Sequence, residues 1–366
     1  MFDEMTRMVL FLFWVGFLGE FPLKLTRRIG GCSNWNRHTQ YNAKKLGYIE
    51  IVRHKLHGHV LRSARLTQAG LDYVCSCNPE AGAYLLAKGC PLNCSNRVRD
   101  VARAHALSIG QMMAALSGSI VLPDQKPSLL LHKKGPAVKI DPSVAYYYTT
   151  SELRLGIEEF DPSVTSKTSR ILGVIVRGSH CYCLYHTGHS RMYWVSQNEH
   201  NIIDSIETLL LSRGFKCTEF SQVLISDKMC VAESIARQNI NCVSKYFTVS
   251  DSFAHTYFIT NDHDGDALLT LIVNPEADLA AKRRYLTNYS APSVSTRSYD
   301  AVTSDGLNPV ILGYHFDLLH LLTLDEAPDG FRYRPILLCY EYQVNTIQRI
   351  VGHQIDVRSI EEDLDE

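Results

Sequence analysis

Apolar and polar positions at the start of the chain predict a series of short helices. Thr6 can cap an apolar helix that ends near Gly19, and a second short helix is predicted over residues 20–29. Ser33 can then cap a polar helix that stops at Gly47, a residue type typical of C-caps. The pattern therefore predicts three helices before any strand.

Two alternating stretches follow the polar helix. Residues 48–53 and 60–66 alternate as strands, a basic turn at 56–59 joins them, and Thr67 can cap a further helix over 68–74. This is the element order of a winged helix-turn-helix. In such a module a helix fits the major groove of DNA, while a basic hairpin beside it holds phosphates or the minor groove.

The charge of this region indicates a polyanionic partner. Residues 24–65 carry ten Lys or Arg against one acid, Glu50, an excess of nine, although the whole chain has a formal net charge of −1. Such a concentration of like charge costs self-repulsion in a compact fold, so we expect it to meet nucleic acid. A winged module that binds only protein, with solvated charges, is the alternative.

Each predicted element has an expected role in binding duplex DNA. We expect base edges to be read by Asn36, Arg37, His38 and Gln40 of the polar helix, with Trp35 and Tyr41 anchoring it. We expect phosphates to be held by Lys44, Lys45, Arg53, Lys55, His57, His59, Arg62 and Arg65. Phosphate contacts supply affinity without sequence information.

The chain contains eleven cysteines, and four of them could form a metal site. An odd number without an export signal indicates reduced thiols. Cys75 and Cys77, then Cys90 and Cys94, could place four thiolates around zinc. Neither spacing is the common C-x2-C, and residues 80–88 between them read as helix. Incidental buried thiols are therefore the favoured interpretation, and we expect no cofactor.

The apolar run over residues 8–18 is too short to cross a bilayer, and Asp3 and Glu4 make the preceding leader acidic. We therefore expect a buried first helix, no membrane association and a cytoplasmic protein. Composition shifts predict four regions, and the oligomeric state stays open. They are a winged module at 1–78, a helical linker region at 79–142, a mixed α/β domain at 143–358 and an acidic tail at 359–366.

The third region begins with apolar strands and continues with alternating helices and strands. Strands are predicted at 145–148, 170–177, 180–187, 192–195, 222–226, 245–249, 255–259, 310–314, 336–340 and 355–358. Helices are predicted at 199–212, 231–238, 264–273, 316–322 and 343–351. Because a hairpin precedes alternating elements, we expect a mixed sheet covered by helices.

Several stretches resemble replication-relaxation proteins, more narrowly those carried on conjugative elements and plasmids of Gram-positive gut bacteria. They are the N-terminal module through Arg65-Leu66-Thr67-Gln68-Ala69-Gly70, the Arg103-Ala104-His105 helix, residues 169–174 with 182–188, and Met192-Tyr193-Trp194. The resemblance implies a winged helix joined to an α/β domain like that of restriction-type nucleases. It also implies an association with plasmid replication or mobilisation.

The residues of the second domain do not supply the usual chemistry for cutting DNA. A restriction-type nuclease needs an acid on the second strand of its hairpin and a Glu-x-Lys on the next, since two carboxylates hold the metal. Residues 181–185 contain no acid, and 192–199 contain no Glu-x-Lys. The nearby carboxylates, for which helix capping and surface solvation are the favoured roles, are Glu152, Glu158, Glu159, Asp161 and Glu199. We therefore expect a degenerate nuclease-like fold.

Two other chemical interpretations are also disfavoured. A relaxase needs a histidine cluster and a tyrosine nucleophile, but the triplet Tyr146, Tyr147 and Tyr148 lies in an apolar strand. The acidic run at 262–266 has its glycine misplaced for a calcium loop, so Asp262 or Asp264 is better read as a helix N-cap.

Together these patterns predict a non-catalytic, sequence-selective double-stranded-DNA-binding protein of a bacterial mobile element, acting in transcription, replication or mobilisation control. Two alternatives stay open. One is a metal-dependent DNA nuclease or nicking accessory. The other is a scaffold, or an inhibitor of a host defence complex, that binds a protein partner through the second domain.

Overall fold

The computed structural model describes residues 5–30, 32–56, 59–87, 94–131, 138–160, 169–190, 192–241, 245–250, 252–291, 299–326 and 334–361. Over these ranges the chain is a mixed α/β protein with three sheets. The mixed α/β class is confirmed, but the strands of 143–358, expected in one mixed sheet, form two separate sheets. The chain divides into two compact units, Met1–Met112 and Met113–Glu366. The helical region expected at 79–142 is therefore split between the two units, and most of the expected acidic tail lies outside the described residues.

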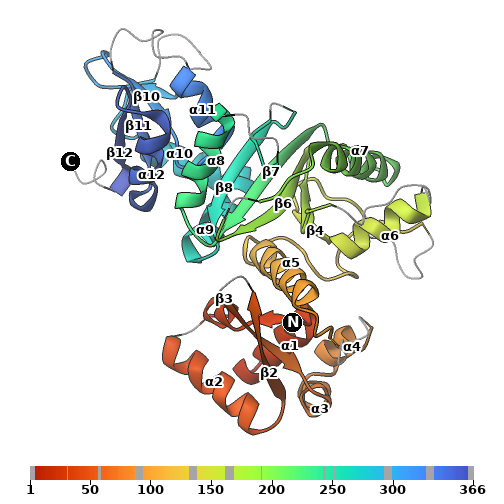
Figure 1. The fold of residues 1–366 in the computed structure, drawn as a ribbon. Helices are drawn as coiled ribbons and strands as arrows, with labels where there is room; N and C mark the ends of the chain where they lie inside the picture. Colours follow the sequence, from red (N-terminus) through yellow and green to blue (C-terminus); the bar gives the residue numbers. More distant parts are fainter. Residues whose placement is uncertain are drawn as a thin grey trace. The chain divides into compact units, whose positions relative to one another are not determined.

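The first unit alternates helices with a small sheet (Figure 1). Its elements are α1 (Arg7–Leu18), β1 (Phe21–Pro22), the 3-10 helix η2 (Leu23–Arg28), α2 (Ser33–Lys45), β2 (Ile49–Leu56), β3 (His59–Leu66), α3 (Gln68–Cys77), α4 (Pro79–Ala87) and α5 (Val98–Leu116), which runs into the second unit. The short helix expected over 20–29 is confirmed in part: it is the 3-10 helix η2, and the two-residue strand β1 precedes it.

The helix caps explain where these elements begin. The Thr6 side chain accepts a hydrogen bond from the Val9 N–H, and the Thr67 side chain accepts one from the Gly70 N–H, so both predicted caps are confirmed. Ser33 is instead the first residue of α2, and Cys32 occupies the N-cap position without a side-chain hydrogen bond. Gly47 follows the end of α2 with φ of +73°, a conformation that glycine adopts without strain.

The sheet of the first unit has the strand order β1-β3-β2. The end of the hairpin at Leu66 packs against Gly16 of α1 and Gly70 of α3. Strands β2 and β3 pair antiparallel from Ile49 opposite Leu66 to Leu56 opposite His59. Ile49 and Leu66 are buried, as is most of α1. The predicted hairpin and the buried first helix are confirmed. Among the described helices, none combines the length and apolarity needed to cross a membrane.

The second unit contains two sheets and their covering helices. Its elements are β4 (Tyr146–Thr149), α6 (Thr150–Phe160), β5 (Gly173–Arg177), β6 (His180–Gly188), α7 (Ser196–Ser212), β7 (Glu219–Ser226), α8 (Cys230–Asn241), β8 (His255–Thr260), α9 (His263–Val273), α10 (Pro275–Tyr285), β9 (Ala301–Val302), β10 (Pro309–Leu312), α11 (Leu318–Glu326), β11 (Ile336–Cys339), α12 (Glu341–Val351) and β12 (Asp356–Ser359).

The larger sheet has the order β4-β5-β6-β7-β8 and is mixed. Strands β4, β5 and β6 are antiparallel neighbours, whereas β6, β7 and β8 run parallel. One face presents alternate residues of these strands to a core shared with α6, α7, α8 and α11. The smaller sheet, β12-β11-β10-β9, is also mixed.

The predicted strands at 192–195 and 245–249 are wrong. They form an isolated antiparallel bridge between Tyr193 and Tyr246, with backbone hydrogen bonds from the Trp194 N–H to the Lys245 carbonyl at 3.2 Å and from the Phe247 N–H to the Met192 carbonyl at 2.9 Å, but no regular strand. Helix α6 and helix α10 were not predicted. None of the α10 residues is buried, so its sequence lacks the apolar stripe that identifies a surface helix.

Candidate nucleic-acid interface

Helix α2 has a buried face and an exposed polar face. Asn36, Thr39 and Ala43, spaced three and four residues apart, are buried against the rest of the first unit. The opposite side carries exposed side chains, which are Trp35, Arg37, His38, Tyr41, Lys44 and Lys45. Trp35 and Tyr41 are 65% and 62% exposed, unusually high for aromatic residues. An outward helix face with four basic or imidazole groups and two aromatics is thus presented to solvent.

Two residues expected to read bases instead hold α2 in place. Asn36 Oδ1 accepts a hydrogen bond of 2.8 Å from the Arg7 guanidinium. Gln40 Nε2 donates to Thr26 Oγ1 at 2.6 Å and to the Leu23 carbonyl at 3.3 Å, which ties α2 to η2. Because these amides are engaged within the fold, the expectation for Asn36 and Gln40 is corrected to a positioning role.

Arg7 is a residue that the sequence analysis missed. Its guanidinium also donates to the Gly30 carbonyl and lies 6.0 Å from the Trp35 ring centroid, a cation–π distance. It therefore fixes both the start of α2 and the orientation of an exposed aromatic. No local pattern identifies it, because Arg7 and Asn36 are far apart in sequence.

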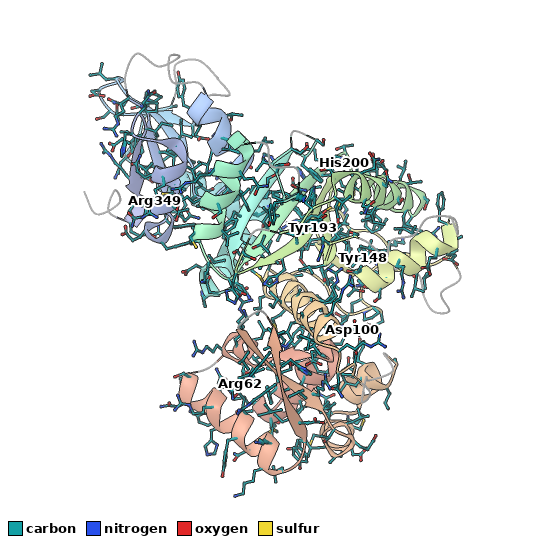
Figure 2. All side chains as sticks on the ribbon, in the orientation of Figure 1. Arg62, Asp100, Tyr148, Tyr193, His200 and Arg349 are labelled. Atoms are coloured by element: carbon teal, nitrogen blue, oxygen red, sulfur yellow. The ribbon has the colours of Figure 1, made fainter. Side chains whose placement is uncertain are left out.

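The distal half of the β2–β3 hairpin carries positive charge on one face. Arg53 stands directly opposite Arg62, and Lys55 stands opposite Val60, with all four side chains exposed. The ion pairs between described residues do not include Arg53, Lys55 or Arg62. Arg62 is labelled in Figure 2. Like charges directly opposite each other destabilise a hairpin, so this arrangement is not explained by stability.

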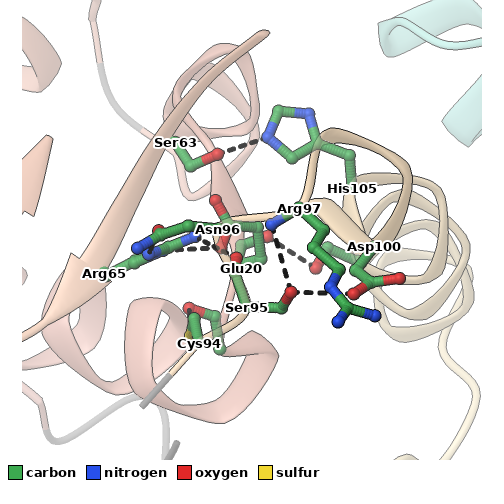
Figure 3. Close-up of polar contacts among 11 residues, drawn as sticks. Glu20, Ser63, Arg65, Cys94, Ser95, Asn96, Arg97, Asp100 and His105 are labelled. Atoms are coloured by element: carbon green, nitrogen blue, oxygen red, sulfur yellow. Dashed lines mark hydrogen bonds and ion pairs between the residues drawn. The ribbon is translucent and has the colours of Figure 1, made fainter. Parts of the chain in front are cut away.

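Arg65 lies on the other face of the hairpin and is buried, which corrects its expected role. Side chains alternate along a strand, so Arg62 and Arg65 point to opposite sides. Arg65 Nε lies 2.7 Å from Glu20 Oε2, and its other nitrogens donate to Asn96 Oδ1 and the Ser95 carbonyl, both at 2.8 Å (Figure 3). Its guanidinium is thus satisfied inside the first unit.

The same buried face is joined to α5 by further polar contacts. Ser63 is hydrogen-bonded to His105, and Ser108 Oγ donates to the Glu20 carbonyl at 2.8 Å. These contacts cover the Ser63 and Arg65 face of the hairpin. On the opposite face Ala64 and Leu66 are buried as well, so it is the distal half, with Arg53 and Arg62, that is exposed to solvent.

Three histidines, His38, His57 and His59, were also predicted to contact DNA. His57 and the side chain of His59 lie outside the described residues. His38 Nδ1 lies 3.0 Å from Asn42 Nδ2 on the exposed side of α2. The candidate residues that are exposed on α2 and the hairpin are Trp35, Arg37, His38, Tyr41, Lys44, Lys45, Arg53, Lys55 and Arg62.

The predicted zinc cysteines give no site in the described part of the chain. Cys90 lies outside it, and among the residues that are described no group of three His, Cys, Asp or Glu is placed to hold a metal ion. Cys94 Sγ lies 3.9 Å from the Gly19 carbonyl, and burial raises the pKa of its thiol. Cys75 packs against Gly82 of the following helix.

The candidate catalytic residues of the second unit are engaged in the fold. Glu199 is buried and accepts hydrogen bonds from the Arg170 N–H at 2.6 Å and from Ser169 Oγ at 2.9 Å. Tyr147 and Tyr148 are also buried, their hydroxyls donating to the Leu172 and Pro127 carbonyls. Burial raises the pKa of Tyr148. Glu199 thus stabilises the segment at residues 169–170, and the two tyrosines stabilise the core.

Of the two predicted N-cap candidates, Asp262 and Asp264, Asp262 is the N-cap of α9. Its Oδ1 accepts a hydrogen bond of 3.1 Å from the Gly265 N–H at the start of α9. A Cβ at Gly265 would lie only 1.7 Å from the Thr260 carbonyl oxygen, so the glycine permits this close turn.

The chain matches no known family model, no curated protein and no solved structure.

Proposed function

We propose that the first unit binds double-stranded DNA through the exposed face of α2 and the exposed distal half of the β2–β3 hairpin. The observation that carries the proposal is the exposure of six basic side chains on these elements. They are Arg37, Lys44, Lys45, Arg53, Lys55 and Arg62. Glu50 is the only acid in the sequence of α2, β2 and β3, so the positive field of this surface is almost uncompensated.

The element order supports a winged helix-turn-helix mode of binding. Helix α2 would lie in the major groove with Arg37 and His38 at base edges, and Tyr41 and Trp35 beside the sugar-phosphate backbone. Lys44 and Lys45, in the last turn of α2, would hold phosphates. The hairpin would hold further phosphates through Arg53, Lys55 and Arg62.

The resemblance to replication-relaxation proteins extends the proposal to its biological setting. We assign this chain to a bacterial mobile element, where sequence-selective binding would act in transcription, replication or mobilisation control. The second unit would be the degenerate nuclease-like domain of that family. Its hairpin strand β6 carries buried cysteines and tyrosines in place of metal-binding carboxylates, which supports a role without catalysis.

The experiment that tests the proposal begins with a genomic pull-down, which selects a bound DNA fragment for affinity measurements at several salt concentrations. The five phosphate contacts assigned to Lys44, Lys45, Arg53, Lys55 and Arg62 predict a slope of about −4.5 for the logarithm of affinity against the logarithm of salt concentration. The double variant Lys44→Ala/Lys45→Ala should weaken binding to all sequences and reduce that slope by about 2.

The matched control removes two exposed positive charges from the second unit, Arg283 and Arg284 of α10. Arg283→Ala/Arg284→Ala should leave affinity and slope close to those of the unaltered protein. Equal affinity of the Lys44/Lys45 variant and the unaltered protein for the selected fragment would contradict the proposal.

A further inference from the structure

The second unit contains a pocket of about 380 Å³ on the helix-covered face of its larger sheet. Pockets of this size are typical of small-molecule sites. Its walls come from the start of α7, residues 248–250 with Phe253, and α11, and its floor comes from β7. Residues lining it are Trp194, Ser196, His200, Gln222, Thr248, Val249, Ser250, Phe253, Leu319, Leu322 and Thr323. Figure 2 labels His200, and Tyr193, which precedes the Trp194 wall.

The wall at Trp194 is rigid. Its ring packs edge-on against Tyr185 at 5.2 Å and against Phe247 at 4.9 Å between centroids. Only 8% of Trp194 is exposed, although it lines the pocket. A fixed indole beside Phe253 and Leu322 offers an apolar surface on which a planar ring can pack.

The floor supplies an amide, a group that both donates and accepts hydrogen bonds. Gln222 is 1% exposed, and its Oε1 accepts a hydrogen bond of 3.3 Å from Thr256 Oγ1, a residue that is itself fully buried. A carbonyl oxygen has two lone pairs, so this bond orients the amide and leaves Oε1 able to accept a second. A carboxamide fixed in this way suits a ligand edge with a neighbouring donor and acceptor.

The charge of the lining limits the ligand further. Among the eleven described residues that line the pocket, none is Asp, Glu, Lys or Arg. A charged ligand would lose its hydration without gaining an opposite charge, which is costly. The pocket therefore favours a neutral ligand.

We propose that this pocket binds a neutral nucleobase, with the ring against Trp194 and its hydrogen-bonding edge on Gln222. The base would arrive as a free nucleoside or as a nucleotide turned out of a single strand, and both sources present the same ring and edge. The inference goes beyond the proposed DNA interface, because it uses none of the residues of α2 or the hairpin.

Isothermal titration of the full chain with adenosine, guanosine, cytidine, thymidine and uridine tests the first source. A short single-stranded oligonucleotide tests the second when it is compared with the same strand carrying one abasic position. We expect saturable binding of at least one nucleoside, or affinity for the intact strand at least about tenfold above the abasic strand. A nucleoside 5′-monophosphate should bind no more tightly than its nucleoside.

Two variants assign the binding to the pocket. Gln222→Leu keeps the side-chain size but removes the amide, and should lower affinity by at least about tenfold. Thr323→Trp fills the pocket from an exposed position of α11, so it should block binding while the protein stays folded. Tyr193→Phe is the control, since Tyr193 is exposed and lies outside the lining.

Absence of binding to every nucleoside, with equal affinity for the intact and abasic strands, would overturn the proposal. Binding that Thr323→Trp leaves unchanged would overturn it as well. Neither result depends on duplex binding by the first unit, so the two proposals can fail separately.

Discussion

Arg65 Nε lies 2.7 Å from Glu20 Oε2, and both side chains are buried, although the two residues are 45 positions apart in the chain. The basic residues of the hairpin therefore differ in what they do. Arg65 forms a buried ion pair that stabilises the fold, whereas Arg53 and Arg62 are exposed to solvent. Composition alone does not distinguish them.

Removal of Glu20 should therefore be strongly destabilising. Glu20→Gln leaves the Arg65 charge buried without its partner, which we expect to cost about 3–5 kcal/mol of unfolding free energy. Urea unfolding measures the loss. The control is Glu50→Gln, because Glu50 is exposed and stands opposite Arg65 in the strand register. This change should stay within about 0.5 kcal/mol of the unaltered protein. Similar losses for both variants would contradict the assignment.

Arg62→Glu should change stability and DNA affinity in opposite directions. It replaces a like-charge pair with an attractive pair across the hairpin, so unfolding free energy should rise by about 0.2–1 kcal/mol. Affinity for duplex DNA should fall, since the variant loses a phosphate contact and adds a repulsive charge. Urea unfolding and fluorescence anisotropy measure the two effects. Arg62→Gln, which is neutral, should give intermediate values, and unchanged DNA affinity in Arg62→Glu would argue against the hairpin as a DNA contact.

Arg37→Ala should relax sequence preference more than it weakens binding in general. An Arg at a guanine edge discriminates by about 1–3 kcal/mol against other bases. We therefore expect the affinity ratio between the selected fragment and a shuffled fragment to fall, measured by competition gel shift. Lys44→Ala should lower both affinities equally, because phosphate contacts carry no sequence information. A preserved ratio in Arg37→Ala would place base reading elsewhere.

Local pattern was sufficient for much of the first unit. The Thr6 and Thr67 caps, the polar helix and the hairpin follow from residue spacing, because those elements depend on neighbours along the chain. The roles of Asn36, Gln40 and Arg65 could not be predicted in this way. Their partners are the Arg7 guanidinium, the η2 carbonyls and Glu20, which only the folded chain brings within reach.

In the second unit, too, features set by neighbours along the chain were predicted and features set by distant partners were not. Strands with continuous apolar alternation, such as β5 and β6, were identified, whereas α10 has no buried residue to mark it. The pocket was not predicted because Gln222, Trp194 and Leu322 come from separate elements. A single glutamine within an apolar strand was the only local signal for its floor.

Asp278, on α10, should make the second unit sensitive to acid. Burial by itself would raise the pKa of Asp278, but hydrogen bonds from His315 and Tyr314, with the charges of His315 and Lys282, lower it to about 2. The Tyr314 hydroxyl donates to Asp278 Oδ1 at 2.5 Å, and the carboxylate lies 2.6 Å from His315 Nε2 and 3.2 Å from Lys282 Nζ. In the unfolded chain an aspartate has a pKa of about 3.9.

The sign of the effect follows from this difference. A pKa lowered by folding contributes stability that is fully present above about pH 4 and is lost as the pH falls towards about 2. Asp278→Asn should therefore lower the urea midpoint at pH 7, and the gap to the unaltered protein should shrink between about pH 4 and pH 2. Asp204→Asn, at an exposed position of α7, is the control and should leave the midpoint nearly unchanged at each pH. If the difference in urea midpoint between Asp278→Asn and the unaltered protein stayed constant down to pH 2, the ionised carboxylate would not be the group that links α10 to His315.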